Sequence, residues 1–206
     1  MNPAARVSNR TLLALAAFGI TSEPRDATPP LLAESLATAL APRDRVLITG
    51  PSASGKSRLG RAIAAVAVLQ GQRVVRIDPS QPHARGDARM LDVIPGPIPR
   101  AWSLLSRVGL ADATLLPRRI RELSEGESFR LLIARALARE PDVLVVDEFC
   151  SALDSRLARS VCLSLCARAP CALIAITARE DVARWFPART TVNCSRTTAP
   201  ILETAA

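Results

Sequence analysis

The chain of 206 residues contains a single lysine, Lys56, although lysine and arginine together number 27. It belongs to the sequence Gly50-Pro51-Ser52-Ala53-Ser54-Gly55-Lys56-Ser57, which matches the phosphate-loop motif G-x-x-x-x-G-K-[ST], or Walker A motif. The ammonium of lysine is a compact point charge, whereas the guanidinium of arginine is a planar fork, so neither replaces the other at a phosphate. The position of the only lysine therefore indicates a loop whose residues bind nucleotide phosphates.

The segments on either side of this loop support the motif. Arg45–Thr49 reads as a short buried strand that runs into the loop. Ser57–Gln70 predicts a helix that leaves the loop, with apolar residues at helical spacing and Gly71 as its stop. In such a strand–loop–helix unit, backbone N–H groups and the helix N-terminus converge on an anion.

Strand and helix patterns alternate along the rest of the chain. Further strands are expected at Arg73–Asp78, Val143–Val146, Cys171–Thr177 and Thr190–Cys194, and a short one at Met90–Ile94 inside a Pro/Gly-rich loop, Pro79–Pro99. Further helices are expected at Arg100–Val108, at Ser128–Arg139 with Phe129, Leu132, Ile133 and Ala136 inward and Arg130, Arg135 and Arg139 outward, and around Leu153, Leu157, Val161 and Leu165. This alternation predicts an α/β P-loop NTPase fold, with a mainly parallel central sheet and helices on both faces. We expect one domain over 1–206, with a lead-in at 1–44 and a reduced helical and signature region at about 79–127.

The net charge of +8 leaves binding to nucleic acid open as one interpretation. The arginines are scattered, however, with no run beyond Arg118-Arg119. Aromatic residues make up only 3% of the chain, too few for a platform on which bases would stack. Nothing beyond the net charge therefore supports a nucleic-acid partner.

The cysteines and the N-terminal segment bear on the cellular compartment. Cys162 and Cys166 lie four apart on one face of a predicted helix, a spacing that can bind a metal, but His83 is distant in sequence and no Cys-x-x-Cys pair occurs. Small buried thiols in a reducing cytosol are the favoured interpretation.

The uncharged stretch Thr11–Ile20 superficially resembles a signal peptide but is too short to span a bilayer. We expect it to be a helix packed on the domain of a cytoplasmic protein.

Two carboxylates follow the apolar strand Val143–Val146. A carboxylate at this position, here Asp147, can hold Mg²⁺ through water beside the hydroxyl of Ser57. The adjacent Glu148 can polarise an attacking water molecule. The alternative without a function is a strand-end turn with two solvated acids. Because Lys56 and the phosphate loop are present in the same chain, this alternative is less favoured.

Two further motifs complete a family pattern. Leu123-Ser124-Glu125-Gly126-Glu127 lies between the phosphate loop and Asp147, and Ser151-Ala152-Leu153-Asp154 follows Glu148. Over Arg45–Asp181 the chain resembles the ABC ATPases, which carry a phosphate loop, an L-S-x-G signature, a strand that ends in Asp-Glu and an S-x-L-D loop in this order. More closely, 104–113, 147–151 and 177–181 resemble ABC-type ATPases that are fused to a predicted acetyltransferase domain, a part for which this chain ends too soon.

The resemblance implies a role for each matching residue. Gly50 to Ser57 would bind the phosphates of ATP, with Lys56 also catalytic, and Ser57 and Asp147 would hold Mg²⁺. Glu148 would be the general base. Ser124 and Gly126 would contact the γ-phosphate of an ATP held by a second subunit, and Asp154 would lie at the dimer seam.

The departures from the family pattern bear on turnover. The signature usually reads Leu-Ser-Gly-Gly-Gln, and the extra negative charge of Glu125 and Glu127 is expected to weaken a closed dimer. Ala178 stands where the family has a switch histidine. Gln81 is a candidate for the glutamine loop, and Phe18 is a candidate for the adenine-stacking aromatic, although a core phenylalanine is favoured.

The sequence thus predicts ATP binding and slow hydrolysis by an ATP-sandwiched homodimer, with ATP and Mg²⁺ as cofactors. One alternative is an ATP-loaded switch that hydrolyses little and acts through an unknown protein partner. Another is the ATP-binding subunit of a transporter. We rank the transporter lower, because the short stretch between Lys56 and Leu123 leaves little room for a subdomain that grips a membrane partner.

Overall fold

A computed structural model of the protein describes residues 30–78, 86–195 and 200–204. The expectations for Thr11–Ile20, Phe18, Gln81 and His83 lie outside the described residues. Among the described residues, no helix is both long enough and apolar enough to cross a bilayer.

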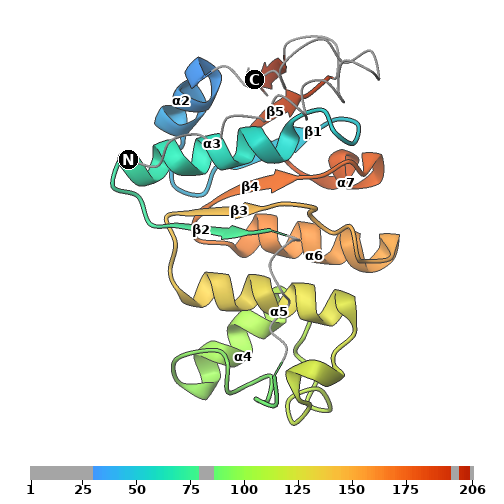
Figure 1. The fold of residues 1–206 in the computed structure, drawn as a ribbon. Coiled ribbons are helices and arrows are strands. Elements are labelled where there is room, and N and C mark those ends of the chain that lie inside the picture. The colour runs from blue at the N-terminus through green and yellow to red at the C-terminus, as the bar shows by residue number, and fades with distance from the viewer. Residues whose placement is uncertain (1–29, 79–85, 196–199, 205–206) are drawn as a thin grey trace, which may run out of the picture.

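A six-stranded sheet with the order β2-β3-β4-β1-β5-β6 forms the centre of the fold (Figure 1). Its strands are β1 (Arg45–Thr49), β2 (Val74–Ile77), β3 (Val143–Val146), β4 (Ala172–Ile176), β5 (Thr190–Asn193) and β6 (Ile201–Thr204). The first five pair in parallel, and β6 pairs antiparallel with β5. The prediction of a mainly parallel sheet is confirmed.

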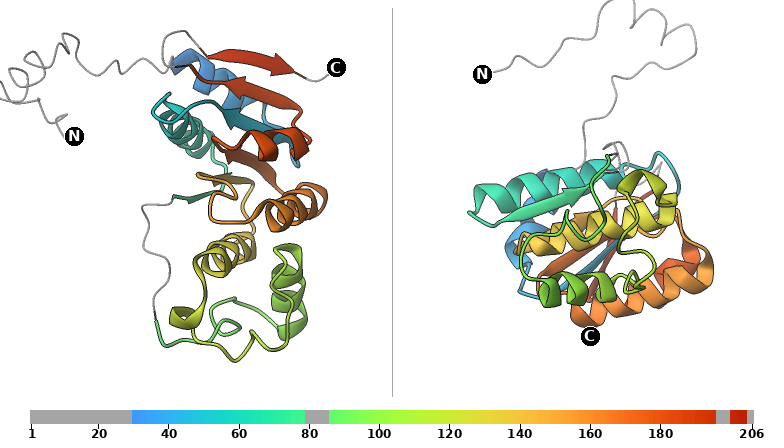
Figure 2. Two further views of the ribbon diagram at one scale, coloured as in Figure 1. Left: turned by 90° about the vertical axis from the view of Figure 1, so that its right-hand side faces the viewer. Right: turned by 90° about the horizontal axis from the view of Figure 1, so that it is seen from below.

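Helices cover both faces of the sheet, as predicted. They are α2 (Pro30–Ala39), α3 (Lys56–Leu69), α4 (Ile98–Arg107), α5 (Glu125–Ala138), α6 (Ser155–Arg168) and α7 (Glu180–Trp185), with a 3₁₀ turn, η1 (Ile120–Glu122). Alternate residues of a strand point to opposite faces. In β1, Val46 and Ile48 pack in the core beneath α2 and α3, and Leu47 packs in the core shared with α4 to α7. The left view of Figure 2 shows α3 and α6 on opposite sides of the sheet.

The structure corrects several details of the prediction. Met90–Ile94 is a series of turns rather than a strand, and an isolated bridge joins Arg89 to Arg119 instead. The helix expected at Arg100–Val108 begins at Ile98, because Pro97 and Pro99 suit the start of a helix. The β5 strand is not the last, since β6 follows; its residues are exposed, so no burial pattern marks them.

Arg130 is the clearest error in side-chain placement. It was expected on the outer face of its helix, but its side chain is buried. Its guanidinium donates hydrogen bonds to the carbonyls of Gly126 and Gly109, and so joins α5 to the end of α4. Satisfying backbone carbonyls allows a charged side chain to be buried, which helical periodicity alone cannot reveal.

Arg45 at the start of β1 is a second buried arginine. Its guanidinium donates to the carbonyls of Cys166 and Ala169, at 2.9 and 2.8 Å, near the end of α6. It also donates to the carbonyl of Cys171 at 2.9 Å. Carbonyls at a helix C-terminus lack intrahelical partners and carry partial negative charge, so a cation there both satisfies and stabilises them.

We expect Arg45→Met to lower the free energy of unfolding by about 3 kcal/mol, because several buried carbonyls lose a charged donor at once. For a chain of this size that corresponds to a fall of about 6–12 °C in Tm, which calorimetry would measure. Arg159→Met, at an exposed position on α6, is the control and should change Tm little. Equal Tm values for the two variants would contradict the role of Arg45.

Candidate functional site

The phosphate loop has the backbone that its motif predicts. β1 ends at Thr49 and α3 begins at Lys56, with no side chain capping the first turn of the helix. Gly50 has φ 137°, and a Cβ there would lie 2.1 Å from the carbonyl oxygen of Cys194, so only glycine fits. Ala53 has φ 61°, a left-handed conformation that costs an alanine roughly 1 kcal/mol. A loop held in this way, followed by an uncapped helix start, is suited to an anion.

Lys56 is the side chain that most strongly indicates an anionic ligand. It is only 9% exposed, and its ammonium donates one hydrogen bond, to the carbonyl of Pro51 at 2.7 Å. No carboxylate of the described residues forms an ion pair with it. An ammonium has three donors, and a buried charge without a counter-ion is costly. A bound phosphate would remove that cost.

A cleft of about 100 Å³ brings the predicted residues together. It is lined by Ser52, Ala53, Lys56, Ser57, Asp147, Glu148, Ile176, Thr177 and Ala178. The sheet explains this meeting: β4 is hydrogen-bonded between β3 and β1, and all three strands run in parallel, so their C-terminal ends share one edge. Ligands of open α/β sheets bind at this edge.

Asp147 and Glu148 sit differently in the cleft. Asp147 is 8% exposed, and its Oδ1 accepts a hydrogen bond from the Glu148 N–H at 3.0 Å. The side chain of Glu148 is exposed, on a residue with φ 53°. The Ser57 hydroxyl and the Asp147 carboxylate are hard oxygen donors, the kind that Mg²⁺ prefers, so the residues present fit the ion.

The signature residues lie elsewhere. Ser124 and Gly126 do not line this cleft; Ser124 is the N-cap of α5, which begins three residues earlier than predicted. Gly126 packs beside the loop after Glu148: a Cβ on it would lie 2.9 Å from Cδ2 of Leu153. Within one chain, Ser124 and Gly126 thus stay outside the cleft of the phosphate loop, although Glu125 lines a smaller hollow together with Asp147 and Glu148.

Glu127 has a local structural role that the sequence analysis missed. Its carboxylate accepts hydrogen bonds from the Ser124 N–H at 2.8 Å and the Ser124 hydroxyl at 2.9 Å, and its own N–H donates back to that hydroxyl. This is a capping box, for which S-x-x-E is the sequence signal. Partial burial alone would raise the pKa of Glu127, but the hydrogen bonds from Ser124 outweigh it and lower the pKa.

Ala178 lines the cleft and offers no side-chain donor. The neighbouring Arg179 does not replace one, because all five of its N–H donors are engaged. They bond to the carbonyls of Cys150 and Leu153, to the hydroxyl of Ser155 and to both carboxylate oxygens of Asp181. These contacts direct Arg179 to the loop after Glu148 and to Asp181.

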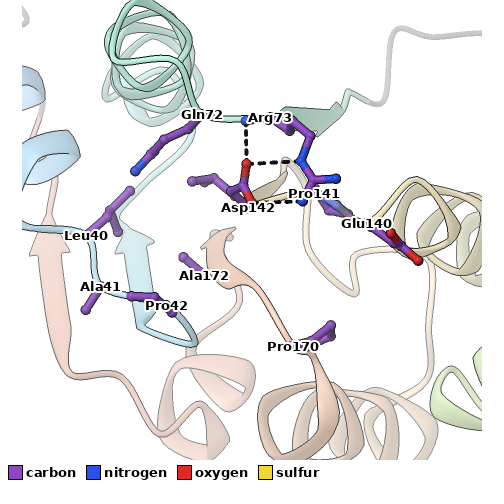
Figure 3. A pocket seen from close by; sticks show the side chains of 11 residues that line it. Leu40, Ala41, Pro42, Gln72, Arg73, Glu140, Pro141, Asp142, Pro170 and Ala172 are labelled. Atoms are coloured by element: carbon purple, nitrogen blue, oxygen red, sulfur yellow. Dashed lines mark hydrogen bonds and ion pairs between the residues drawn. The ribbon is translucent and has the colours of Figure 1, made fainter.

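A larger cavity, of about 420 Å³, lies at the opposite end of the sheet (Figure 3). Its charged groups are already paired: Arg73 bonds to Asp142, and Glu140 bonds to Arg100 at 2.6 Å. The remaining lining is largely proline and aliphatic. The smaller cleft, where the unpaired charge of Lys56 lies at the C-terminal ends of the strands, is therefore the candidate functional site.

Comparison with known proteins shows similarity to ATP-binding proteins of the ABC type. Residues 97–151 match the ABC transporter family, a stretch that contains the signature and Asp147-Glu148. The zinc import ATP-binding protein ZnuC of Alcanivorax borkumensis is 35% identical over 131 residues, which are 56% of this chain and 49% of that protein. The phosphonates import ATP-binding protein PhnC 1 of Rhodopseudomonas palustris is 40% identical over 89 residues, 42% of this chain and 30% of that protein. The chain thus spans about half the length of the ZnuC relatives it matches, or less for PhnC 1.

Solved structures show the fold. The dimeric structure of MJ0796, a bacterial ABC transporter cassette, aligns with a TM-score of 0.63 at 19% identity, over 80% of this chain and 87% of that one. A post-hydrolysis dimer of the same cassette, bound to ADP and Pi, gives a TM-score of 0.62 over 79% and 85% of the two chains. This chain has the fold of an ATP-binding cassette.

We expect Glu127→Ala to destabilise the protein by about 1 kcal/mol at pH 7, because the capping box is lost. The lowered pKa of Glu127 means that its stabilisation is present above the unfolded value near 4.3 and is lost as pH falls through the folded pKa. Urea unfolding should therefore show the difference between wild type and Glu127→Ala shrinking below about pH 4. Glu127→Gln keeps a capping box and should follow wild type at pH 7. A difference that did not depend on pH would contradict this.

Proposed function

We propose that this chain, whose fold is that of an ATP-binding cassette, binds ATP with Mg²⁺ and hydrolyses it slowly to ADP and phosphate. The observation that carries the proposal is Lys56, a buried ammonium without a counter-ion in the described residues, beside the uncapped start of α3. Nucleotide phosphates supply the missing negative charge. The ABC ATPase relatives and family match support ATP as that ligand.

The cleft residues divide the work of hydrolysis. The phosphate loop and Lys56 would hold the phosphates, and Ser57 and Asp147 would hold Mg²⁺, which would neutralise the negative charge that develops during phosphoryl transfer. Glu148, exposed at the rim, takes a proton from the attacking water as general base. Positioning and electrostatics account for most catalysis of phosphoryl transfer.

The signature completes the site in a homodimer. Ser124 and Gly126 do not line the cleft of their own chain, so they act on a nucleotide only if a second copy presents them. The dimeric cassette structures support that arrangement. In this chain the Ser124 hydroxyl already donates to Glu127 at 2.9 Å, so it must leave that carboxylate to reach a phosphate. The altered signature thus disfavours closure, as the sequence suggested.

A second candidate is the ATP-binding subunit of an importer. The names of the relatives favour it, because ZnuC and PhnC 1 are import ATP-binding proteins. The span between α3 and the signature is short and holds only α4 and η1 among its described helices. It leaves little room for a subdomain that grips a membrane partner, so we rank this candidate second. The third candidate function is an ATP-loaded switch that acts through a protein partner. A cytoplasmic location and kinship to the acetyltransferase-fused ATPases are parts of the same proposal.

Mg–ATP at about 100 times its Kd should stabilise the wild type by about 2.7 kcal/mol, a rise of about 5–10 °C in Tm. Lys56→Ala should abolish most of this rise, and Lys56→Arg should not restore it, because a planar fork does not fit the loop. Thermal melts with Mg–ATP and Mg–ADP would measure the effect. Equal rises in wild type and Lys56→Ala would refute the phosphate-loop assignment.

Size-exclusion chromatography of Glu148→Gln in Mg–ATP would show the dimer.

Turnover should be well below the ~10 s⁻¹ that is typical of enzymes, because neither Ala178 nor Arg179 supplies a donor to the γ-phosphate. A preorganised donor is commonly worth about 10²-fold in rate. Ala178→His should therefore raise kcat by about tenfold or more and leave ATP affinity nearly unchanged, since the donor acts in the transition state. Steady-state phosphate release would measure kcat.

Ala178→Leu is the matched control for this substitution, because it adds bulk at the cleft without a donor. Adding Glu148→Gln to Ala178→His should remove the gain. Fast turnover by wild type, or a fall in kcat for a well-folded Ala178→His protein, would show that another residue supplies the donor.

A further inference from the structure

The turn that carries Glu148 is built from unfavourable backbone conformations. Glu148 and Cys150 have φ 53° and 62°, in the left-handed region that residues with a Cβ rarely occupy. Such conformations persist only where surrounding contacts hold them. The chain therefore needs specific bonds to keep Glu148 at the rim of the cleft.

Arg179 supplies the side-chain bonds that hold this segment. Its Nη1 donates to the carbonyl of Cys150 at 2.8 Å and to that of Leu153. Its Nη2 donates to the hydroxyl of Ser155 at 3.1 Å, at the start of α6. One planar group thus bonds to three residues of the segment 150–155. Within the turn itself, the Phe149 N–H donates to the carbonyl of Ile176 at 2.8 Å.

Asp181 fixes the guanidinium in that position. Its two oxygens accept from Nε at 3.0 Å and from Nη2 at 2.6 Å, a bidentate pair with defined geometry. The Ser155 hydroxyl donates to the same carboxylate at 2.8 Å, and the Arg179 N–H donates to Oγ1 of Thr177 at 3.1 Å. Thr177 lines the cleft, so the network begins there and ends at the strained turn.

We propose that Arg179, held by Asp181, is a positioning residue: by binding the loop 150–155 it fixes Glu148 where that carboxylate can take a proton from the water that attacks ATP. The proposal rests on the function proposed above, because Glu148 is there the general base. Arg179 itself cannot touch the nucleotide, since its five donors are all directed at the loop and at Asp181.

The loop that Arg179 holds also packs against the signature. Leu153, whose carbonyl Arg179 holds, packs its side chain against Gly126, where an added Cβ would lie 2.9 Å from Leu153 Cδ2. Loss of Arg179 would therefore disturb both the base and the seat of the signature. It should leave the phosphate loop in place, because all five side-chain donors of Arg179 bond to 150–155 and to Asp181. The link of Thr177 to β1 is a backbone hydrogen bond to the carbonyl of Ile48, which does not involve the guanidinium.

The test compares Arg179→Ala, Arg179→Lys and Asp181→Asn with wild type. Steady-state phosphate release gives kcat and KM, and titration with Mg–ATP followed by thermal melts gives binding. Arg179→Ala should lower kcat by about 30-fold and change the apparent affinity for Mg–ATP less than threefold, because misplacing a reacting group acts on the chemical step. Arg179→Lys should recover little, since an ammonium cannot match the fork.

The control is Arg184→Ala, at an exposed position on α7, the helix that Arg179 precedes; it should keep kcat within twofold of wild type. Asp181→Asn replaces the carboxylate by a neutral acceptor of the same size and should lower kcat about tenfold, so the proposal stays testable if Arg179→Ala does not fold. Wild-type kcat in folded Arg179→Ala or Asp181→Asn, with Mg–ATP binding intact, would overturn the positioning role alone. A wild type that neither binds nor hydrolyses Mg–ATP would overturn the proposed function and this inference together.

Discussion

The parallel pairing of β1, β4 and β3 is the constraint on which the site depends. Because β4 lies between the other two, the residues that follow each strand meet at one edge of the sheet. Lys56 comes to that edge from β1, Asp147 from β3 and Ala178 from β4. Gly60 allows the close approach of α3 that this requires, since a Cβ there would lie 2.3 Å from Cδ1 of Ile176. The residues of the proposed anion site, cation site and general base are thus brought together by one topology.

Buried and half-buried arginines hold the loops and helix ends around this sheet. Arg45, Arg130 and Arg179 each donate to backbone carbonyls near the end or start of a helix. With aromatic residues at 3%, few large rings are available to fill such junctions. A guanidinium spans several acceptors at once, which an ammonium cannot do. This gives the arginine-rich composition a structural meaning that net charge alone does not convey.

The sequence predicted what local patterns encode and missed what tertiary contacts decide. The phosphate loop, β3 and the position of Asp147 follow from a motif and an apolar run, and the structure places them as expected. The burial of Arg130 and the hydrogen bonds of Arg179 depend on carbonyls that are distant in sequence. The periodicity of apolar residues in the sequence does not predict such contacts. Glu127 was different, because S-x-x-E was present in the sequence and signals a capping box. The family resemblance directed attention to the charge of Glu127 instead.

Two departures from the family pattern act on the same stage of the reaction. Ala178 removes a donor from the γ-phosphate, and the capping box occupies the hydroxyl of Ser124 that a second subunit would present. Neither change touches the phosphate loop, whose uncapped helix start and buried ammonium remain suited to binding. Ground-state binding and transition-state stabilisation are separable, because only contacts that strengthen in the transition state raise kcat. A chain of the proposed kind, which keeps ground-state binding and weakens transition-state stabilisation, would stay loaded with ATP for a long time before hydrolysis, as a slow ATPase or an ATP-loaded switch does.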